Sequence, residues 1–248
     1  MQNGDDSRWD SYQRRYQSGE SRTAIFRDLV LDDAERIVAG SGRPVLLDIG
    51  CGGGFDRSSG TQRSLAGVAG KYVGVEPDTE IGLQDVFHEC HRCLFEDASI
   101  DPGSIDIAFA VMVLEHFDQP QQFWDKIYSI LRPGGVFWGF TVDARHWFVS
   151  ASLLAEKLHI KDLYLDTLHG RRGEQRYENY GVFYRTNTPE QVASMTGAFS
   201  SRIFLNLNRV GQMDYYLPKR LQWVGRLADR ISLRMGWPGS TLAVRVTK

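Results

Sequence analysis

Long apolar runs are absent from the 248-residue sequence. A helix that spans a membrane needs roughly 20 consecutive, mostly apolar residues, and no stretch approaches that length. Residues 1–20 are polar and lack the apolar core of a secretory signal peptide. The sequence therefore predicts a cytoplasmic protein without a membrane span.

Charge of one sign and cysteine are also scarce. The 29 basic and 31 acidic residues leave a formal net charge of −2, so the chain lacks the basic excess that attracts nucleic acid. The three cysteines (Cys51, Cys90 and Cys93) are an odd number, which favours reduced thiols over a disulfide framework. No nucleic-acid partner is expected.

Strand-like and helical segments alternate along most of the chain. Short, almost continuously apolar segments indicate strands that are covered on both faces of a parallel sheet. The predicted strands are residues 45–49, 72–75, 92–95, 105–111, 136–142, 201–207 and 242–246. This alternation predicts an α/β fold, with a doubly wound, mostly parallel seven-stranded sheet and helices on both faces.

Helical periodicity describes the N-terminus and the connections between strands. Residues 1–40 are predicted to form two helices, and residues 120–131 a third that ends at a Pro-Gly-Gly turn. The alternation stops at residues 143–187, which are rich in Tyr, His, Arg and Leu. We interpret that segment as a lid inserted after the fifth strand, at the edge of the sheet where ligands of such folds bind.

A glycine-rich turn follows the first predicted strand, within residues 45–54. Glycine lets the backbone bend sharply and approach a ligand, because no Cβ is in the way. The spacing does not match a dinucleotide motif, since Phe55 and Arg57 stand where that motif needs Gly or Ala. Asp48 would repel a pyrophosphate but attract a cationic ligand.

The pattern Asp-x-Gly-x-Gly-x-Gly at residues 48–54 resembles the first motif of the class I methyltransferases that depend on S-adenosyl-L-methionine (SAM). Further segments resemble the later motifs of that family in the same order, and they are residues 73–77, 95–98, 104–116 and 131–136. The resemblance is strong over residues 45–142. It implies a single Rossmann-like domain, divided into N-terminal helices (1–40), a SAM-binding half (41–142), an acceptor-binding lid (143–187) and a C-terminal half of the sheet (188–248).

The resemblance also implies which residues hold the cofactor. The acid after the second strand, here Glu76, would accept both ribose hydroxyls, and the acid after the third, here Asp97, would receive the adenine amino group. The implied cofactor-binding residues are Asp48, Gly50, Cys51, Gly52, Gly54, Glu76, Pro77, Asp97, Ala98 and Met112. Methyl transfer would release S-adenosyl-L-homocysteine.

Trp9, Tyr12 and Tyr16 recur at helical spacing and form one aromatic face of the first predicted helix. Most such faces pack against a protein core. In the methyltransferase family, however, an N-terminal helix often closes over the cofactor. Tyr12 and Tyr16 are therefore candidate cofactor contacts, with ordinary packing as the alternative.

His116 is the candidate catalytic residue. It follows the fourth predicted strand, on the rim where the resemblance places the methyl group, and an alcohol or phenol that is methylated must lose a proton to a base. The alternative role of His116 is to fix the loop at a helix start. Glu115 would orient this segment or cap the helix, and would not take the proton. The expected activity is O-methylation of a small molecule such as a sugar or a secondary metabolite. Transfer to N or C, and a SAM-binding partner protein that transfers no methyl group, remain open.

Two other patterns carry weaker signals. A metal site at residues 88–93 is not expected, because strand alternation would place Cys90 and Cys93 on opposite faces. Residues 219–237 form an apolar helical face with basic residues around it, which favours a helix packed on the sheet. Peripheral contact with a membrane through this segment is the alternative. The oligomeric state stays open.

Overall fold

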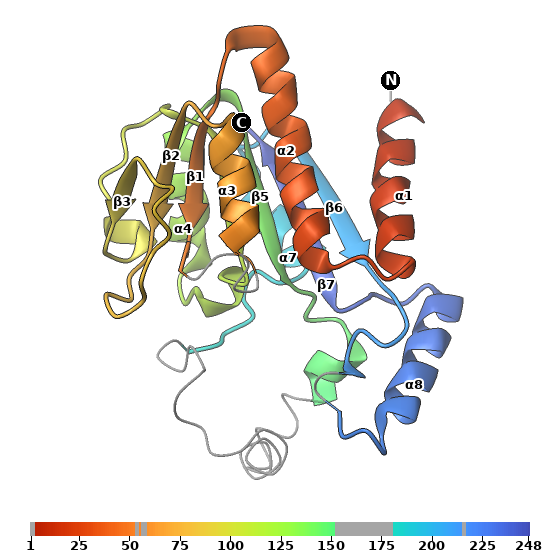
Figure 1. The fold of residues 1–248 in the computed structure, drawn as a ribbon. Helices are drawn as coiled ribbons and strands as arrows, with labels where there is room; N and C mark the ends of the chain where they lie inside the picture. Colours follow the sequence, from red (N-terminus) through yellow and green to blue (C-terminus); the bar gives the residue numbers. More distant parts are fainter. Residues whose placement is uncertain (1–2, 53–54, 56–58, 152–180, 215–216) are drawn as a thin grey trace.

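The computed structural model describes residues 3–52, 55, 59–151, 181–214 and 217–248 (Figure 1). They include a seven-stranded sheet with the order β3-β2-β1-β4-β5-β7-β6. The strands are β1 (Val45–Ile49), β2 (Lys71–Val75), β3 (Glu89–His91), β4 (Ile105–Val111), β5 (Leu131–Val142), β6 (Ser201–Leu207) and β7 (Thr241–Thr247). Strands β1 to β5 pair in parallel, and β7 runs antiparallel to β5 and β6. The prediction of a doubly wound, mostly parallel α/β fold is confirmed.

Helices cover both faces of the sheet (Figure 1). They are α1 (Asn3–Gln17), α2 (Arg22–Ser41), α3 (Ser59–Val68), α4 (Pro120–Ile130), α7 (Pro189–Met195) and α8 (Gln222–Met235), with 3-10 turns η1 (Phe95–Asp97) and η2 (Leu114–His116). On the face of α1 to α3, Phe26 stacks on Phe140 of β5, with ring centroids 4.2 Å apart. On the face of α4, Trp124 packs edge-on against Phe137 at 5.3 Å. Both predicted N-terminal helices are confirmed.

The third strand differs from its prediction. It spans Glu89–His91 and pairs with β2, whereas the predicted strand at residues 92–95 is wrong. Phe95 begins η1 instead and is buried against α4, where its ring centroid lies 5.3 Å from that of Phe123. The apolar character of this segment therefore serves packing against a helix.

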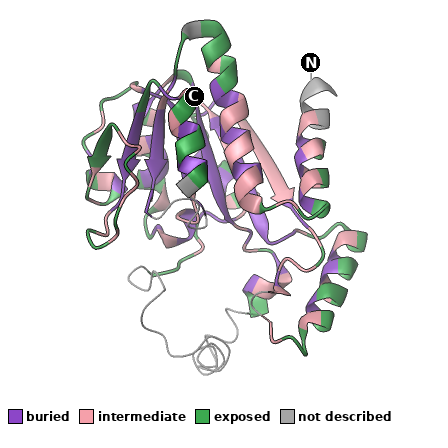
Figure 2. Cartoon of the chain, viewed as in Figure 1, coloured by how far each residue is buried: buried purple, intermediate pink, exposed green. Residues whose placement is uncertain are grey.

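Helix α8 also differs from its prediction. We expected its apolar face to pack on the sheet, but Leu227 and Ile231 are exposed while Gly225, Asp229 and Ser232 are buried (Figure 2). The prediction of an apolar face against the sheet is wrong, because polar and small residues make the contacts with the rest of the molecule.

Most of the predicted lid, residues 152–180, lies outside the described residues. The division of the chain into a SAM-binding half, a lid and a C-terminal half therefore stays a prediction. None of the described helices is long and apolar enough to cross a membrane.

Candidate active site

The glycine-rich turn after β1 is fixed to the end of β2. The backbone N–H groups of Gly50 and Cys51 both donate to the carbonyl oxygen of Val75, at 2.8 and 3.1 Å. Gly50 has a φ of +71°, and a Cβ built there would lie 2.5 Å from Cγ2 of Val113. Only glycine therefore fits at this position. Gly54 lies outside the described residues.

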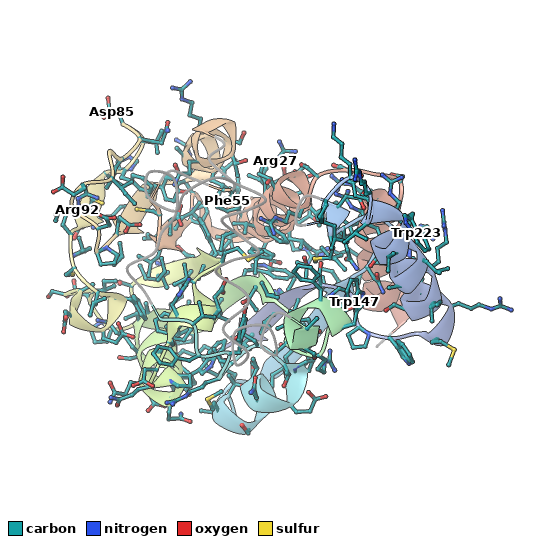
Figure 3. All side chains as sticks on the ribbon, turned by 90° about the horizontal axis from the view of Figure 1, so that it is seen from below. Arg27, Phe55, Asp85, Arg92, Trp147 and Trp223 are labelled. Atoms are coloured by element: carbon teal, nitrogen blue, oxygen red, sulfur yellow. The ribbon has the colours of Figure 1, made fainter. Side chains whose placement is uncertain are left out.

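Phe55 is the one described residue between Gly52 and α3. Its side chain is buried, and its ring lies edge-on against Phe109 of β4, with centroids 5.6 Å apart. Figure 3 views the molecule from the end at which the parallel strands finish, and Phe55 lies toward the middle of that view. The bulky residue that breaks the dinucleotide motif thus anchors the turn in the core.

Glu76 follows β2 and is only 5% exposed. Its Oε2 accepts a hydrogen bond from the N–H of Gly52 at 2.8 Å, and its Oε1 accepts from the N–H of Asp78 at 3.0 Å. A carboxylate has about four acceptor positions. Two remain for paired hydroxyls, which fits the predicted contact with a ribose. Pro77, which lies between Glu76 and Asp78 in the sequence, is half-buried.

Asp48 is buried beneath the glycine-rich turn. Its Oδ2 accepts hydrogen bonds from Nε2 of Gln62 and the hydroxyl of Tyr72, both at 3.0 Å. Burial raises the pKa of Asp48 to about 7, although both hydrogen bonds favour the ionised form. The carboxyl group is therefore poised to ionise when a cation binds nearby.

The amide of Gln62 connects Asp48 to the turn, because its Nε2 also donates to the carbonyl oxygen of Cys51 at 2.8 Å. Its Oε1 is buried and has no hydrogen-bond partner among the described residues. Such an acceptor fits a ligand that brings N–H or O–H donors. Together with the acceptor positions of Glu76, it shows that these residues fit SAM, which carries an ammonium and two ribose hydroxyls. The sequence pattern did not indicate Gln62 or Tyr72, since neither belongs to a motif.

Cys51 packs under the turn rather than outward. Its side chain is buried, and burial raises the pKa of its thiol. A Cβ at Gly74 of β2 would lie 2.9 Å from Sγ of Cys51 and 3.2 Å from Sγ of Cys90. Gly74 therefore makes room for both thiols. Its close contact with them was not evident from the sequence.

Asp97 and Ala98 lie at the end of η1. Asp97 is exposed, whereas Ala98 is buried. The carbonyl oxygen of Ala98 accepts a hydrogen bond from Nζ of Lys126 in α4 at 2.6 Å. This contact fixes the turn after β3, and the adenine contact of Asp97 stays a prediction.

Met112 comes directly after β4 and has a φ of +54°, a left-handed conformation that non-glycine residues rarely adopt. Its N–H donates to the carbonyl oxygen of Phe140 at 2.7 Å, which holds it in place. Strained residues of this kind cluster at functional sites. Met112 therefore fits its predicted place in the cofactor site.

His116 ends η2, beyond the carboxyl end of β4. Its Nδ1 lies 2.9 Å from the carbonyl oxygen of Gly181, within the predicted lid. A carbonyl oxygen only accepts, so Nδ1 is the donor and the neutral ring has its lone pair on Nε2. This tautomer is the one that a general base acting through Nε2 requires.

Glu115 is buried beside His116 and links the rim to the last residues of the predicted lid. Its Oε2 accepts from the hydroxyl of Thr141 at 2.8 Å, and that hydroxyl oxygen accepts from Nδ2 of Asn187 at 2.6 Å. Its carbonyl oxygen accepts from the N–H of Phe183 at 2.8 Å. Burial raises the pKa of Glu115. Thr141 and Asn187 were missed because they come from distant parts of the sequence.

The aromatic face of α1 lies in the core. Trp9 contacts Trp138 of β5 edge-on, with ring centroids 6.0 Å apart. The hydroxyl of Tyr12 donates to Asp32, and the guanidinium of Arg209 lies 4.4 Å from the ring centroid of Tyr16. Burial raises the pKa of both tyrosines. Packing accounts for these contacts, and the cofactor contact of Tyr16 stays a prediction.

The described residues contain no group of three or more His, Cys, Asp or Glu side chains that could hold a metal ion. Cys90 is exposed in β3, and Cys93 lies beyond the end of that strand. Alternation along one strand therefore does not determine how the two thiols are oriented relative to each other.

Part of the sequence is similar to proteins of a known family. Residues 47–139 match the model of a methyltransferase domain. A ubiquinone biosynthesis O-methyltransferase of Sodalis glossinidius is 31% identical over 97 residues, which cover 36% of this chain and 38% of that protein. The chain spans less than half the length of the curated relatives it matches.

The fold is similar to solved methyltransferase structures. A SAM-dependent methyltransferase of Archaeoglobus fulgidus superposes with a TM-score of 0.53 and 14% identity, over 94% of this chain and 97% of that one. The geranyl diphosphate C-methyltransferase of Streptomyces coelicolor, solved with S-adenosyl-L-homocysteine, gives 0.52 and 14%, over 90% of this chain and 74% of that one. Residues 47–139 therefore match a methyltransferase domain, and the described residues have the fold and strand order of SAM-dependent methyltransferases.

Proposed function

We propose that the protein transfers a methyl group from SAM to a hydroxyl group of a small molecule, with His116 as the general base. The observation that carries this proposal is the hydrogen bond from Nδ1 of His116 to the carbonyl oxygen of Gly181. It selects the tautomer with the lone pair on Nε2, at the rim beyond β4. The names of the curated relatives, which are O-methyltransferases, support the same acceptor atom.

The described residues would have different roles in the reaction. Bound SAM supplies an electrophilic methyl group. The carboxylate of Glu76 would accept the ribose hydroxyls, and the ionised carboxyl of Asp48 would attract the positive charge. Nε2 of His116 would take the proton that the acceptor hydroxyl loses, and Glu115 would hold the loop through Thr141.

Turnover with matched acceptors tests the proposal. The purified chain would be incubated with methyl-labelled SAM and with phenols, catechols and sugar alcohols, each paired with the corresponding amine. We expect label in at least one hydroxyl compound and not in its amine partner, with release of S-adenosyl-L-homocysteine. Label in amines alone would favour the N-methyltransferase alternative. SAM binding without turnover of any acceptor would favour a partner protein that transfers no methyl group.

Replacement of His116 tests its role. His116→Ala should lower kcat for a hydroxyl acceptor by a factor of about 10² to 10⁴, with SAM affinity almost unchanged, because general-base catalysis contributes about that much. An acceptor with a lower hydroxyl pKa should be less affected, since it needs less help from a base. Equal losses for all acceptors would contradict a base at His116 and indicate that it only fixes the loop.

A further inference from the structure

Helix α8 turns its apolar side outward. Trp223 is 65% exposed and Met235 61%, and Val224, Leu227 and Ile231 between them are also exposed. Two apolar residues at the helix ends, Leu221 and Trp237, are exposed as well. Figure 2 shows the exposed outer side of α8, and Figure 3 places Trp223 on α8 toward the rim of the molecule. Contiguous exposed apolar side chains of this kind mark an interaction surface.

The orientation of α8 is fixed by contacts on its opposite side. Oδ2 of Asp229 accepts a hydrogen bond from the N–H of Gly211 at 2.8 Å, and Asp229 itself is fully buried. Gly225 lies against Leu217, and a Cβ at this position would overlap Cδ1 of Leu217. The helix therefore cannot rotate its apolar side inward without losing a buried hydrogen bond and a close contact.

The exposed side of α8 is also basic. Arg230 and Arg234 are exposed beside the apolar residues, and Lys219 and Arg220 precede the helix. The acid within residues 219–237 is Asp229, which is buried. Because the whole chain carries a net charge of −2, this basic character is a local feature of the α8 surface. An occupant of complementary chemistry is apolar and anionic.

We propose that the exposed side of α8 docks on the surface of an anionic lipid bilayer. Leu227 and Ile231 would enter the boundary between headgroups and acyl chains, as the apolar faces of interfacial helices do. Trp223 would lie at the headgroup level, where the amphipathic indole ring is favoured. Arg230 and Arg234 would contact lipid phosphates.

A second copy of the chain fits this surface less well. A symmetric contact would place the same patch on both partners, so that Arg230 and Arg234 of two copies would meet. Like charges brought together in this way oppose association. The proposal stands on α8 and does not depend on the methyl acceptor.

The position of α8 relates membrane docking to the candidate active site. In Figure 1, α8 lies at the end of the molecule where β1 finishes, which is also the end that carries the glycine-rich turn. His116 follows β4, which runs parallel to β1. A bilayer bound to α8 would therefore lie beside the end of the molecule that holds the candidate active site.

Co-sedimentation with vesicles tests the proposal. The full chain would be mixed with vesicles of phosphatidylcholine alone or of phosphatidylcholine with phosphatidylglycerol. We expect binding to the mixed vesicles that weakens as salt is raised. The variant Trp223→Ser/Leu227→Ser/Ile231→Ser should bind roughly 100-fold more weakly, because it removes most of the apolar contact. Arg230→Gln/Arg234→Gln should weaken binding roughly tenfold on the anionic vesicles.

Matched controls remove exposed residues of the same kind elsewhere. Val38→Ser/Leu94→Ser changes two exposed apolar residues, and Arg14→Gln/Arg63→Gln changes two exposed arginines of α1 and α3. Both controls should bind as the wild type does. All variants alter exposed side chains, and thermal unfolding checks that each is folded.

Tryptophan fluorescence identifies the face that meets the lipid. Brominated acyl chains should quench the wild type, and Trp223→Phe should remove much of that quenching. Absent vesicle binding, or equal binding by the α8 variants, would overturn the proposal. A wild-type dimer that the triple variant converts to monomers would assign the surface to a second copy instead. Failure of acrylamide to quench Trp223 without lipid would show that another part of the chain covers it, and would also overturn docking.

Discussion

At the scale of single residues, the candidate cofactor site depends on two carboxyl groups in different surroundings. Glu76 receives two backbone N–H groups, so its oxygens are held in fixed positions. Asp48 lies deeper, and burial raises its pKa to about 7. The first carboxylate thus suits neutral hydroxyl donors, while the second can respond to the charge of a ligand.

Replacing Glu76 with Gln should weaken SAM binding about 10- to 100-fold. A glutamine has a single acceptor oxygen, and its NH₂ group would face the N–H of Gly52 or of Asp78. Loss of hydrogen bonds to a charged group costs about 1.5–3 kcal/mol. Isothermal titration calorimetry with SAM measures the change. Glu89→Gln, at an exposed carboxylate of β3, is the control and should bind SAM normally; equal losses in both variants would contradict the role of Glu76.

Gly74→Ala should destabilise the protein by about 1–3 kcal/mol, because its Cβ would overlap Sγ of Cys51 and a ring carbon of Phe87. Gly67→Ala in α3 has open space around the added methyl group and should stabilise by up to about 1 kcal/mol. Urea unfolding of both variants measures whether each is less or more stable than the wild type. A Gly74→Ala protein as stable as the wild type would show that the turn and β2 move apart easily.

At the scale of elements, the start of α7 fixes the last residues of the predicted lid. Thr188 caps the helix, and its hydroxyl accepts from the N–H of Gln191 at 3.2 Å. The side chain of Gln191 accepts from the N–H groups of Asn187 and Thr188 and donates to the carbonyl oxygen of Tyr184. One side chain therefore ties residues 184–188 to the helix.

Thr188→Ala should lower the free energy of unfolding by about 1 kcal/mol, the usual cost of losing such a cap. Ser194→Ala, in the same helix, removes an exposed hydroxyl bonded to a carbonyl oxygen and should change stability by less than half as much. Urea unfolding monitored by circular dichroism compares them. Equal effects would show that the cap adds nothing beyond the loss of a hydroxyl.

The sequence predicted most elements because their patterns are local. The helix at residues 120–131 and the strand at Ser201–Leu207 are present in the structure where the sequence placed them. The orientation of α8 could not be predicted this way. Its apolar periodicity is real, but the side that packs is decided by contacts of Asp229 and Gly225 with residues that precede the helix. The support of Asp48 by Tyr72 was equally hidden, because it joins two strands through space.

At the scale of the whole molecule, two buried groups oppose each other in their effect on stability against pH. Burial raises the pKa of Asp48 to about 7 and lowers that of His146 to about 4. Their ordinary values are about 3.9 and about 6.5. Between about pH 4 and about pH 6.5, the folded state therefore holds an extra proton at Asp48 and lacks one at His146, relative to the unfolded state.

The contributions of Asp48 and His146 to the pH dependence of the free energy of unfolding nearly cancel in the wild type. Single variants should separate them. Stability rises with pH where the unfolded state binds more protons. Asp48→Asn removes the effect of Asp48, so its stability relative to the wild type should increase as pH rises from about 4 to about 7. His146→Gln removes the effect of His146, so its stability relative to the wild type should fall as pH rises from about 4 to about 6.5. Urea unfolding of the three proteins at intervals across this range measures both slopes, each approaching one proton per molecule. Parallel pH profiles for all three would show that neither group has the buried, shifted state described, and slopes of the same sign in both variants would contradict their opposition.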